Sequence, residues 1–317
     1  MTVLVTGGAG FIGSHLCASL LRDNFKVIAL DNLDPFYDPE IKKNNLAMLA
    51  SWPAFHFNEG DIRQRRVFRE IFTQNAVDAV VHLAAKAGVR PSILQPADYF
   101  DVNVNGTVQL LEAMAEARVP RLIFASSSSV YGNQEKIPFT ETDDVSQPIS
   151  PYAATKRAGE LMTYTYHHLY GIDVACMRLF TVYGPRQRPD LAIHKFAQLA
   201  LENKPIPLYG DGQTKRDYTF VADIIRGIRQ VLALPGLGYQ IFNLSSGTPV
   251  TLLEMVHALE FALGHPLRIQ FLEKQAGDVE QTFADITKAQ AYFNYTPQVQ
   301  LQEGVRQFVD WFSHQHL

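Results

Sequence analysis

Two residues near the middle of the sequence, Tyr152 and Lys156, carry the clearest chemical signal. They lie four residues apart in the segment SPYAATK, where Ser150 suits a helix N-cap and Pro151 a first helical position. Both side chains are therefore predicted to share one face of a helix. An ammonium group about 6 Å from a phenol, at an effective dielectric of about 20, favours the phenolate by roughly 2 to 3 kcal/mol. We predict that Tyr152 is a general base assisted by Lys156.

A run of four serines follows the apolar segment RLIFA, and the stretch from Ser126 to Gly132 reads SSSSVYG. Polar residues rarely crowd the end of a buried strand unless a ligand is bound there. We therefore expect one of these hydroxyl groups to take part in the reaction beside Tyr152.

A glycine-rich turn, TGGAGFIGSH, follows the first apolar strand and opens a helix. Its glycines let the backbone approach a pyrophosphate, which the N-terminus of the helix attracts. Asp31 ends the next strand, where a carboxylate accepts the ribose hydroxyls of NAD and repels the 2′-phosphate of NADP. No Arg or Lys adjoins Asp31 in the sequence. NAD is therefore the predicted cofactor, with contacts from Gly7, Gly10, Gly13 and Asp31.

The elements that must hold these residues alternate between short apolar runs and amphipathic helical segments. This alternation predicts an α/β fold, a Rossmann-like doubly wound parallel sheet with helices on both faces. After Phe180, Pro and Gly become frequent, and helix-like segments follow with few strands. We predict an NAD-binding domain over residues 1–180 and a smaller, mainly substrate-binding C-terminal domain over 181–317, with segments that can interleave.

The composition narrows the classes of partner. The chain has 317 residues, 47% of them apolar, and a net charge of −4 without any basic block, which argues against nucleic acid. Its two cysteines, Cys17 and Cys176, lack metal-ligand spacing, so we expect no metal site and a reducing compartment. No apolar stretch approaches the length of a membrane span, and TVLVTG leaves no room for a signal peptide. We predict a cytoplasmic protein without a membrane partner.

The chain resembles the extended short-chain dehydrogenase/reductases, and among them the nucleotide-sugar epimerases. Matching segments run from VTGGAGFIGSH through NVNGT, SSSSVYG, SPYAATK and YGPRQRP to GDGQTKRDYTFVAD and AGDVEQTFAD. The resemblance implies that Ser127 completes a catalytic triad with Tyr152 and Lys156 and binds the reacting oxygen of the sugar. A homodimer formed through two helices of each subunit is also implied. The remaining predicted contacts with NAD are Phe11, Ile12, Asn32, Asp61, Ile62, Lys86, Asn103, Tyr152 and Lys156.

The serine run also bears on the type of reaction. Similar proteins that dehydrate a sugar carry an Asp-Glu pair before V-Y-G, and those that decarboxylate UDP-glucuronate carry a Glu, whereas this chain has Ser128 and Ser129 there. Without a carboxyl group to move protons at C5 or C6, the site is limited to removing a hydride and returning it. Epimerisation fits that limit.

Two segments indicate the sugar. The insert DNLDPFYDPEIKKNNL resembles the UDP-glucuronate 4-epimerases, which form UDP-galacturonate for polysaccharide biosynthesis. Arg186 and Arg188 are two residues apart, so in an irregular loop both could face one anion, and a guanidinium fork suits a carboxylate. The resemblance assigns Thr181 and Arg188 to the C6 carboxylate, Arg216 to the phosphates and Asp278 to the nucleotide ribose. The predicted substrate contacts are Arg90, Ser127, Ser128, Thr181, Arg186, Arg188, Arg216 and Asp278.

Two other functions stay open. A 4-epimerase of a neutral sugar nucleotide, UDP-glucose or UDP-N-acetylglucosamine, would leave Arg188 with a structural role. A non-catalytic NAD-sensing protein on the same fold is a remote alternative. Such a sensor would need none of Ser127, Tyr152 and Lys156.

Overall fold

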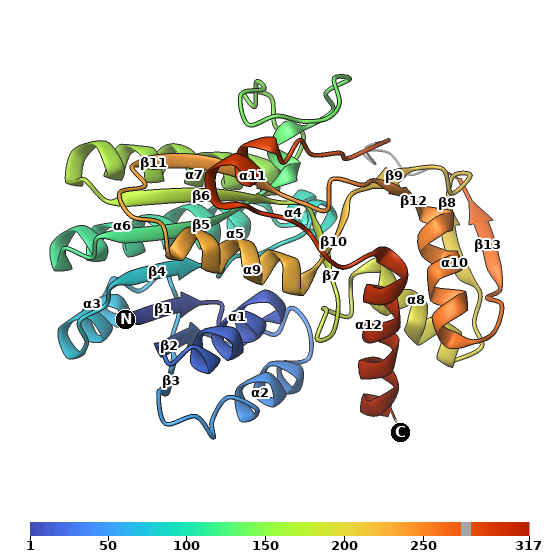
Figure 1. Cartoon of the computed structure of the whole chain (residues 1–317), viewed down its shortest axis with the longest axis horizontal. Coiled ribbons are helices and arrows are strands. Elements are labelled where there is room, and N and C mark those ends of the chain that lie inside the picture. The colour runs from blue at the N-terminus through green and yellow to red at the C-terminus, as the bar shows by residue number, and fades with distance from the viewer. Residues whose placement is uncertain (274–279, 317) are drawn as a thin grey trace.

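A seven-stranded sheet forms the centre of the computed structural model, which describes residues 1–273 and 280–316 (Figure 1). The strand order is β11-β6-β5-β4-β1-β2-β3, and all neighbours are parallel. This is the order of a doubly wound Rossmann-like sheet with one strand added beside β6, which confirms the predicted fold class. The strands are β1 (Thr2–Thr6), β2 (Lys26–Asp31), β3 (Phe55–Glu59), β4 (Ala79–His82), β5 (Arg121–Ser127), β6 (Asp173–Leu179) and β11 (Tyr239–Leu244).

Helices cover both faces of the sheet (Figure 1). Along β1, Val3 and Val5 point into one buried cluster and Leu4 into the other, as the alternation of side chains along a strand requires. The strands therefore read as continuous apolar runs, because both faces are buried. One face carries α1 (Phe11–Arg22), α9 (Val221–Leu232) and α11 (Thr287–Phe293), and the other carries α3 (Arg65–Gln74), α6 (Gly106–Ala117) and α7 (Pro151–Tyr170).

Short elements surround the carboxyl ends of the strands, where ligands bind in open α/β sheets. They are α2 (Pro39–Ala47), α4 (Val89–Leu94), α5 (Pro96–Phe100), the π-helical turn η1 (Asp101–Asn105) and the 3₁₀ turn η2 (Ser128–Tyr131).

A second region, on the right of Figure 1, lies beyond the end of the sheet. It contains the pairs β7 (Thr181–Tyr183) with β10 (Tyr218–Phe220), β8 (Ile206–Tyr209) with β13 (Ile269–Leu272) and β9 (Lys215–Arg216) with β12 (Val250–Thr251). Its helices are α8 (Ala192–Leu201), α10 (Leu252–Leu263) and α12 (Leu301–His316). The expectation of few strands after residue 180 was wrong. The strands of this second region were missed because they are only two to four residues long.

The chain passes repeatedly between the two regions. The predicted boundary at residue 180 lies just after β6, yet α9, β11 and α11 return to the sheet. One buried apolar cluster joins Val5 of β1, Ile224 of α9 and Phe308 of α12. Residues 181–317 therefore contribute to both regions. No helix in the described part of the chain is both long and apolar enough to cross a membrane.

Candidate active site

Helix α7 positions the predicted base. Ser150 Oγ accepts the backbone N–H of Ala153 at 3.1 Å, and Pro151 is the first helical residue. These contacts confirm the predicted start of the helix. The helix packs closely on β5, because a Cβ atom on Gly159 would lie 2.3 Å from the Phe124 ring. This approach brings Lys156 Nζ to 2.8 Å from a backbone carbonyl oxygen of β5.

The charges around Tyr152 differ from the sequence-based expectation. Burial raises the pKa of Tyr152, while hydrogen bonding with Ser127 and the positive charge of Arg188 oppose that rise. Lys156, the expected source of the cation, lies 5.9 Å from the centroid of the Tyr152 ring, over its face, and burial lowers the pKa of this lysine to about 8. Arg188, from a distant segment of the chain, is therefore a second cation that favours the phenolate beside Lys156.

The serines of the run take different directions. Ser126 Oγ donates to Glu160 Oε1 at 2.7 Å inside the protein. Ser127 is the last residue of β5 and faces the side of Tyr152, since successive side chains of a strand alternate. Ser127 Oγ also lies 3.2 Å from Ser129 Oγ, and Ser128 begins η2. The structure brings together the predicted triad of Ser127, Tyr152 and Lys156.

The glycine turn between β1 and α1 fits a dinucleotide. Gly7 has φ +70°, and a Cβ atom on Gly13 would lie 2.1 Å from Gly7 O, so side chains at these positions are excluded. Gly10 caps α1 without any side-chain hydrogen bond. The N-terminal N–H groups of the helix at Phe11 and Ile12 are thus available to a phosphate.

Asp31 has a cationic neighbour that the sequence did not reveal. Its carboxylate accepts the backbone N–H groups of Ala9 at 3.2 Å and Leu33 at 2.9 Å. Helix α2 folds back so that Lys42 Nζ lies 3.5 Å from Asp31 Oδ1, with both residues buried. The absence of a basic residue beside Asp31 therefore holds in the sequence but not in space.

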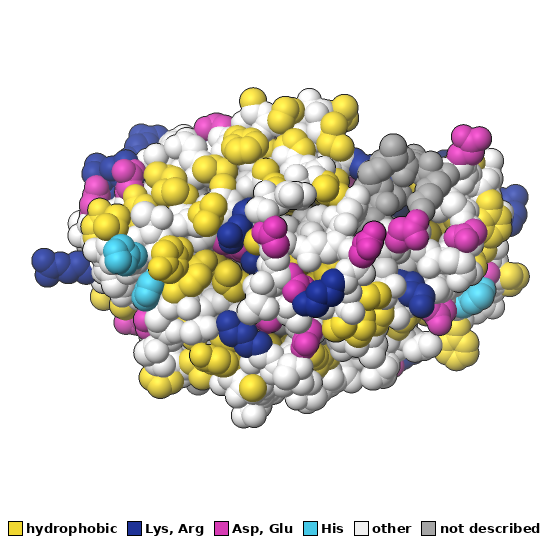
Figure 2. All heavy atoms as spheres, turned by 90° about the horizontal axis from the view of Figure 1, so that it is seen from above, with side chains coloured by type: hydrophobic (Ala, Val, Ile, Leu, Met, Phe, Trp, Pro, Cys, Tyr) yellow, Lys and Arg dark blue, Asp and Glu magenta, His cyan; other side chains and the backbone are white. Residues whose placement is uncertain are grey.

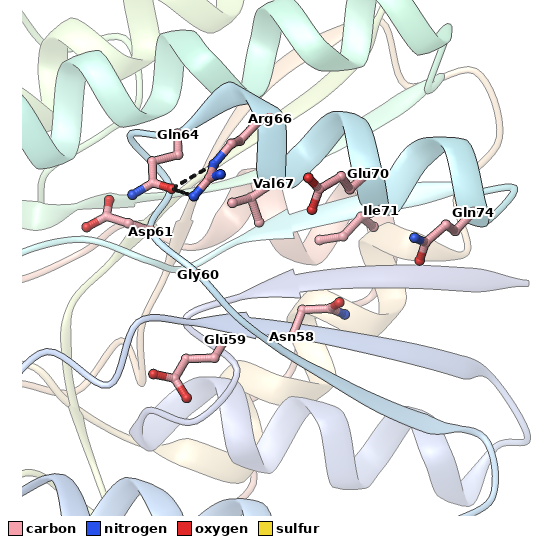
Figure 3. Close-up of a pocket in the computed structure, with 10 residues that line it drawn as sticks. All are labelled: Asn58, Glu59, Gly60, Asp61, Gln64, Arg66, Val67, Glu70, Ile71 and Gln74. Carbon is pink, nitrogen blue, oxygen red and sulfur yellow. Dashed lines mark hydrogen bonds between the residues drawn. The ribbon is translucent and has the colours of Figure 1, made fainter.

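Asp61 lies at the end of β3, beside a polar cavity of about 290 Å³ (Figure 3). Arg63 donates to both of its oxygens, at 2.9 and 2.6 Å, and this fork lowers the pKa of Asp61 to about 2. Asn32 donates to the same carboxylate at 3.2 Å, and the Ile62 side chain is buried against Gly106. The cavity is lined by Asn58, Glu59, Gly60, Asp61, Gln64, Arg66, Val67, Glu70, Ile71 and Gln74.

Asn103 and Lys86 brace the loop between β4 and α4. The Asn103 amide accepts the Lys86 N–H at 2.8 Å and donates to the Lys86 carbonyl oxygen at 2.9 Å and to Thr155 Oγ1 at 3.0 Å. The Lys86 ammonium pairs with Asp98. The Asn103 side chain thereby ties this loop to the helix that carries Tyr152.

Arg186 and Arg188 do not converge on one anion. Arg186 has φ +62°, which breaks the extended path of the loop, and its Nη1 donates to Ser14 Oγ of α1 at 3.3 Å. Arg188 instead forms a fork with Asp190, at 2.9 and 2.7 Å. Its guanidinium also lies 5.5 Å from the centroid of the Phe36 ring. The expectation that both could face one anion is corrected by this divergence, which leaves Arg188 beside Tyr152.

The other predicted substrate residues come from both regions. Thr181 begins β7, just beyond the carboxyl end of β6. Arg90 of α4 lies 5.6 Å from the centroid of the Tyr209 ring on β8, so it connects the two regions. Arg216 lies on β9. Asp278 lies outside the described residues.

Sequence reasoning missed Tyr99 of α5, which packs edge-on against the Tyr152 ring with 6.3 Å between centroids. Its hydroxyl donates to the Ala87 carbonyl oxygen at 3.1 Å. Nothing in the local sequence marks this tyrosine, since its contact with α7 depends on the tertiary fold. Among residues 1–273 and 280–316, no group of three or more His, Cys, Asp or Glu side chains could hold a metal ion.

The NAD dependent epimerase/dehydratase family matches residues 3–245, from β1 to the end of β11. The chain belongs to this family. Membership agrees with the glycine turn, the triad and the strand order described above, and it confirms the resemblance found in the sequence.

Individual relatives narrow the similarity. The chain is 42% identical over 309 residues to a UDP-glucuronate 4-epimerase of Thermodesulfobacterium geofontis, covering 97% of this chain and 95% of that protein. A Bacillus cereus UDP-glucuronic acid 4-epimerase, solved with UDP-glucuronic acid and NAD, is 35% identical with a TM-score of 0.93, covering 99% and 100%. A Thermotoga maritima UDP-glucose 4-epimerase, solved with UDP-glucose, is 31% identical with a TM-score of 0.91, covering both chains completely. Because acid-sugar and neutral-sugar epimerases share the fold, side chains must decide the sugar.

Proposed function

We propose that this protein is an NAD-dependent epimerase that inverts C4 of UDP-glucuronate and forms UDP-galacturonate through a 4-keto intermediate. The observation that carries the proposal is the position of Arg188, whose positive charge acts on the Tyr152 hydroxyl. A fixed guanidinium beside the base suits a sugar whose carboxylate lies one carbon beyond the ring. The relatives from Thermodesulfobacterium geofontis and Bacillus cereus support the same substrate.

The proton at the 4-hydroxyl is handled by the triad. Tyr152 removes it, and Ser127 forms a hydrogen bond with the same sugar oxygen. Because burial raises the pKa of Tyr152, the base depends on Ser127 and on nearby cations to reach the phenolate at neutral pH. The turn from Gly7 to Gly13 would hold NAD, which would supply the acceptor and later the donor of the C4 hydride. The 4-keto sugar turns about its diphosphate linkage before the hydride returns, so C4 gains the opposite configuration. Tyr152 then gives the proton back to the 4-oxygen.

Arg188 also protects the intermediate. A 4-keto sugar with a C6 carboxylate is a β-keto acid, which loses carbon dioxide when the breaking C–C bond aligns with the carbonyl. A site that keeps the intermediate from losing carbon dioxide must hold the carboxylate out of that alignment. We assign this restraint to Arg188 and Thr181, with Ser128 of η2 as a further hydroxyl at the same edge of the sheet.

A neutral UDP-sugar is the second candidate substrate, and the high similarity to the Thermotoga maritima UDP-glucose 4-epimerase favours it. In that case Arg188 has only a structural role, in its ion pair with Asp190. UDP-glucose would then be converted rapidly and UDP-glucuronate slowly.

The deciding experiment follows the anomeric protons of UDP-glucuronate by NMR with purified protein, first without and then with added NAD. We expect UDP-galacturonate to appear at a stable ratio. Tyr152→Phe is the matched control, because it removes only the phenolic oxygen, and its turnover should fall about 10²- to 10⁴-fold. Conversion of UDP-glucose but not UDP-glucuronate would establish the neutral-sugar function instead.

The proposal includes a homodimer in a reducing, cytoplasmic compartment. Helix α7 exposes Leu161, Tyr164, Leu169 and Tyr170, each by more than half, and apolar side chains are visible over the face of the molecule shown in Figure 2. Exposed apolar side chains of this kind suit an interface between two copies. Cys17 and Cys176 are buried free thiols, which suits a reducing environment. Light scattering should give twice the 35.6 kDa chain mass, and a monomer would contradict the dimer.

A further inference from the structure

Asp190 occupies one edge of the Arg188 guanidinium. Arg188 Nε lies 2.9 Å from Asp190 Oδ1 and Nη2 lies 2.7 Å from Oδ2. These two nitrogens form the side-on edge of the group, whereas Nη1 makes no hydrogen bond within the described part of the chain. A guanidinium has five N–H donors in a planar fork. Arg188 therefore keeps a second, end-on edge, Nη1 with Nη2, that can accept another carboxylate.

A tight turn fixes the position of Asp190 relative to Arg188. The Arg188 carbonyl oxygen accepts the Leu191 N–H at 3.2 Å, so residues 188–191 form a turn with Pro189 at its second position, which suits the fixed φ of proline. Asp190 is thereby held by the backbone beside Arg188. The Phe36 ring, 5.5 Å from the guanidinium carbon, restricts the group from another side.

The charges of the pair act on tyrosines in and beside the candidate site. Burial raises the pKa of Tyr99 to about 12, and the charges of Arg188 and Asp190 both act on that hydroxyl with opposite signs. The same two charges act on Tyr37 of the insert after β2, and Arg188 acts on Tyr152. The Arg188 side chain is 19% exposed and that of Asp190 38%. The pair is therefore partly exposed and lies beside the candidate site.

We propose that Asp190 is a positioning residue for substrate recognition, which holds the plane of Arg188 so that its Nη1 and Nη2 edge receives the C6 carboxylate of the sugar. The inference rests on the proposed function, since it requires an acid sugar. Asp190 stays paired when substrate binds, and Arg188 bridges two carboxylates, one from the chain and one from the sugar. An unpaired arginine on a loop would sample many rotamers, and ordering it on binding would weaken affinity.

The experiment compares Asp190→Ala and Asp190→Asn with the unmodified holoenzyme. The KM for UDP-glucuronate is measured beside the inhibition constant of UDP, which lacks the sugar and so reports on fold and nucleotide binding alone. We expect Asp190→Ala to raise KM roughly tenfold with an unchanged kcat and an unchanged UDP constant. Asp190→Asn should lie between, because its amide oxygen still accepts one of the two hydrogen bonds.

Three results would overturn the assignment. A lower KM in Asp190→Ala would mean that Asp190 competes with the substrate for Arg188. An unchanged KM would mean that Arg188 needs no support, and a parallel rise of KM and the UDP constant would mean a merely structural role. Failure of the proposed function is separate, because it is read from the unmodified enzyme, which would then not convert UDP-glucuronate at all.

Discussion

Two arginine–carboxylate pairs in this molecule have the same geometry and opposite surroundings. Arg178 of β6 forks onto Glu160 of α7 through Nε and Nη2, at 2.8 and 3.0 Å. Arg188 uses the same two nitrogens on Asp190, at 2.9 and 2.7 Å. The first pair is 1% and 0% exposed, and the second is 19% and 38% exposed.

The two pairs differ in whether the arginine keeps a hydrogen-bond donor without a partner among the described residues. Arg178 Nη1 donates to a backbone carbonyl oxygen at 3.4 Å, and the guanidinium lies 4.8 Å from the centroid of the Tyr131 ring. Glu160 also accepts from Ser126 and Arg157. Every strong donor and acceptor there is occupied, as burial requires. Arg188 retains an open edge. The spare donor, rather than the ion pair itself, distinguishes a binding site from a structural brace.

Arg178→Met should produce the largest effect on stability. The substitution removes the fork on buried Glu160 and leaves it only Ser126 and the partly exposed Arg157. We therefore expect the free energy of unfolding to fall by about 3 kcal/mol, measured by urea denaturation. The double variant Arg178→Met with Glu160→Leu removes both charges and should recover more than half of the loss. An unshifted urea midpoint in Arg178→Met would mean that this ion pair contributes as little to stability as an exposed pair does.

The stability of Arg178→Met should also depend on pH differently from that of the unmodified protein. Burial alone would raise the pKa of Glu160, but the fork from Arg178 lowers it below its ordinary value, so the unmodified protein gains no proton there between pH 7 and pH 5. In Arg178→Met the pKa of Glu160 is raised, so the folded variant binds a proton before the unfolded chain does. Protonation of Glu160 therefore adds to the stability of the folded variant as pH falls. The difference from the unmodified protein should narrow by about 1 to 2 kcal/mol between pH 7 and pH 5, and a constant difference would exclude this account.

Arg188→Met should have the smallest effect on stability and a large one on chemistry. A partly exposed pair contributes less than about 1 kcal/mol, so the urea midpoint should hardly move. The kcat/KM for UDP-glucuronate should fall about 10- to 100-fold, and a UDP-4-keto-pentose should appear by mass spectrometry as the carboxylate loses its restraint. Normal turnover with a clean product would remove Arg188 from substrate recognition.

Local signals explain what the sequence predicted well. Ser150, Pro151 and the four-residue spacing of Tyr152 and Lys156 are short-range features, so the helix start and the shared face follow from them. The glycine turn is equally local. The parallel, doubly wound sheet followed from the alternation of apolar runs and helices, because parallel strands need crossover helices.

Long-range geometry explains what the sequence did not predict. The cation beside Asp31 is Lys42, which arrives only when α2 folds back over the end of β2. The split between Arg186 and Arg188 depends on one backbone angle, and two arginines two residues apart look equivalent before that angle is known. The strand β11 was missed because the chain leaves the sheet after β6 and returns only after α9.

That return of the chain has a consequence for biosynthesis. During translation β6 emerges long before β11, its outer neighbour, which ends at Leu244. The face covered by α9 also stays open until that helix, which ends at Leu232, has emerged. We therefore expect nascent chains shorter than this to expose apolar surface and to engage chaperones. The interleaving also means that no contiguous gene segment encodes the complete seven-stranded sheet without part of the second region, because β11 follows β7 to β10 in the chain.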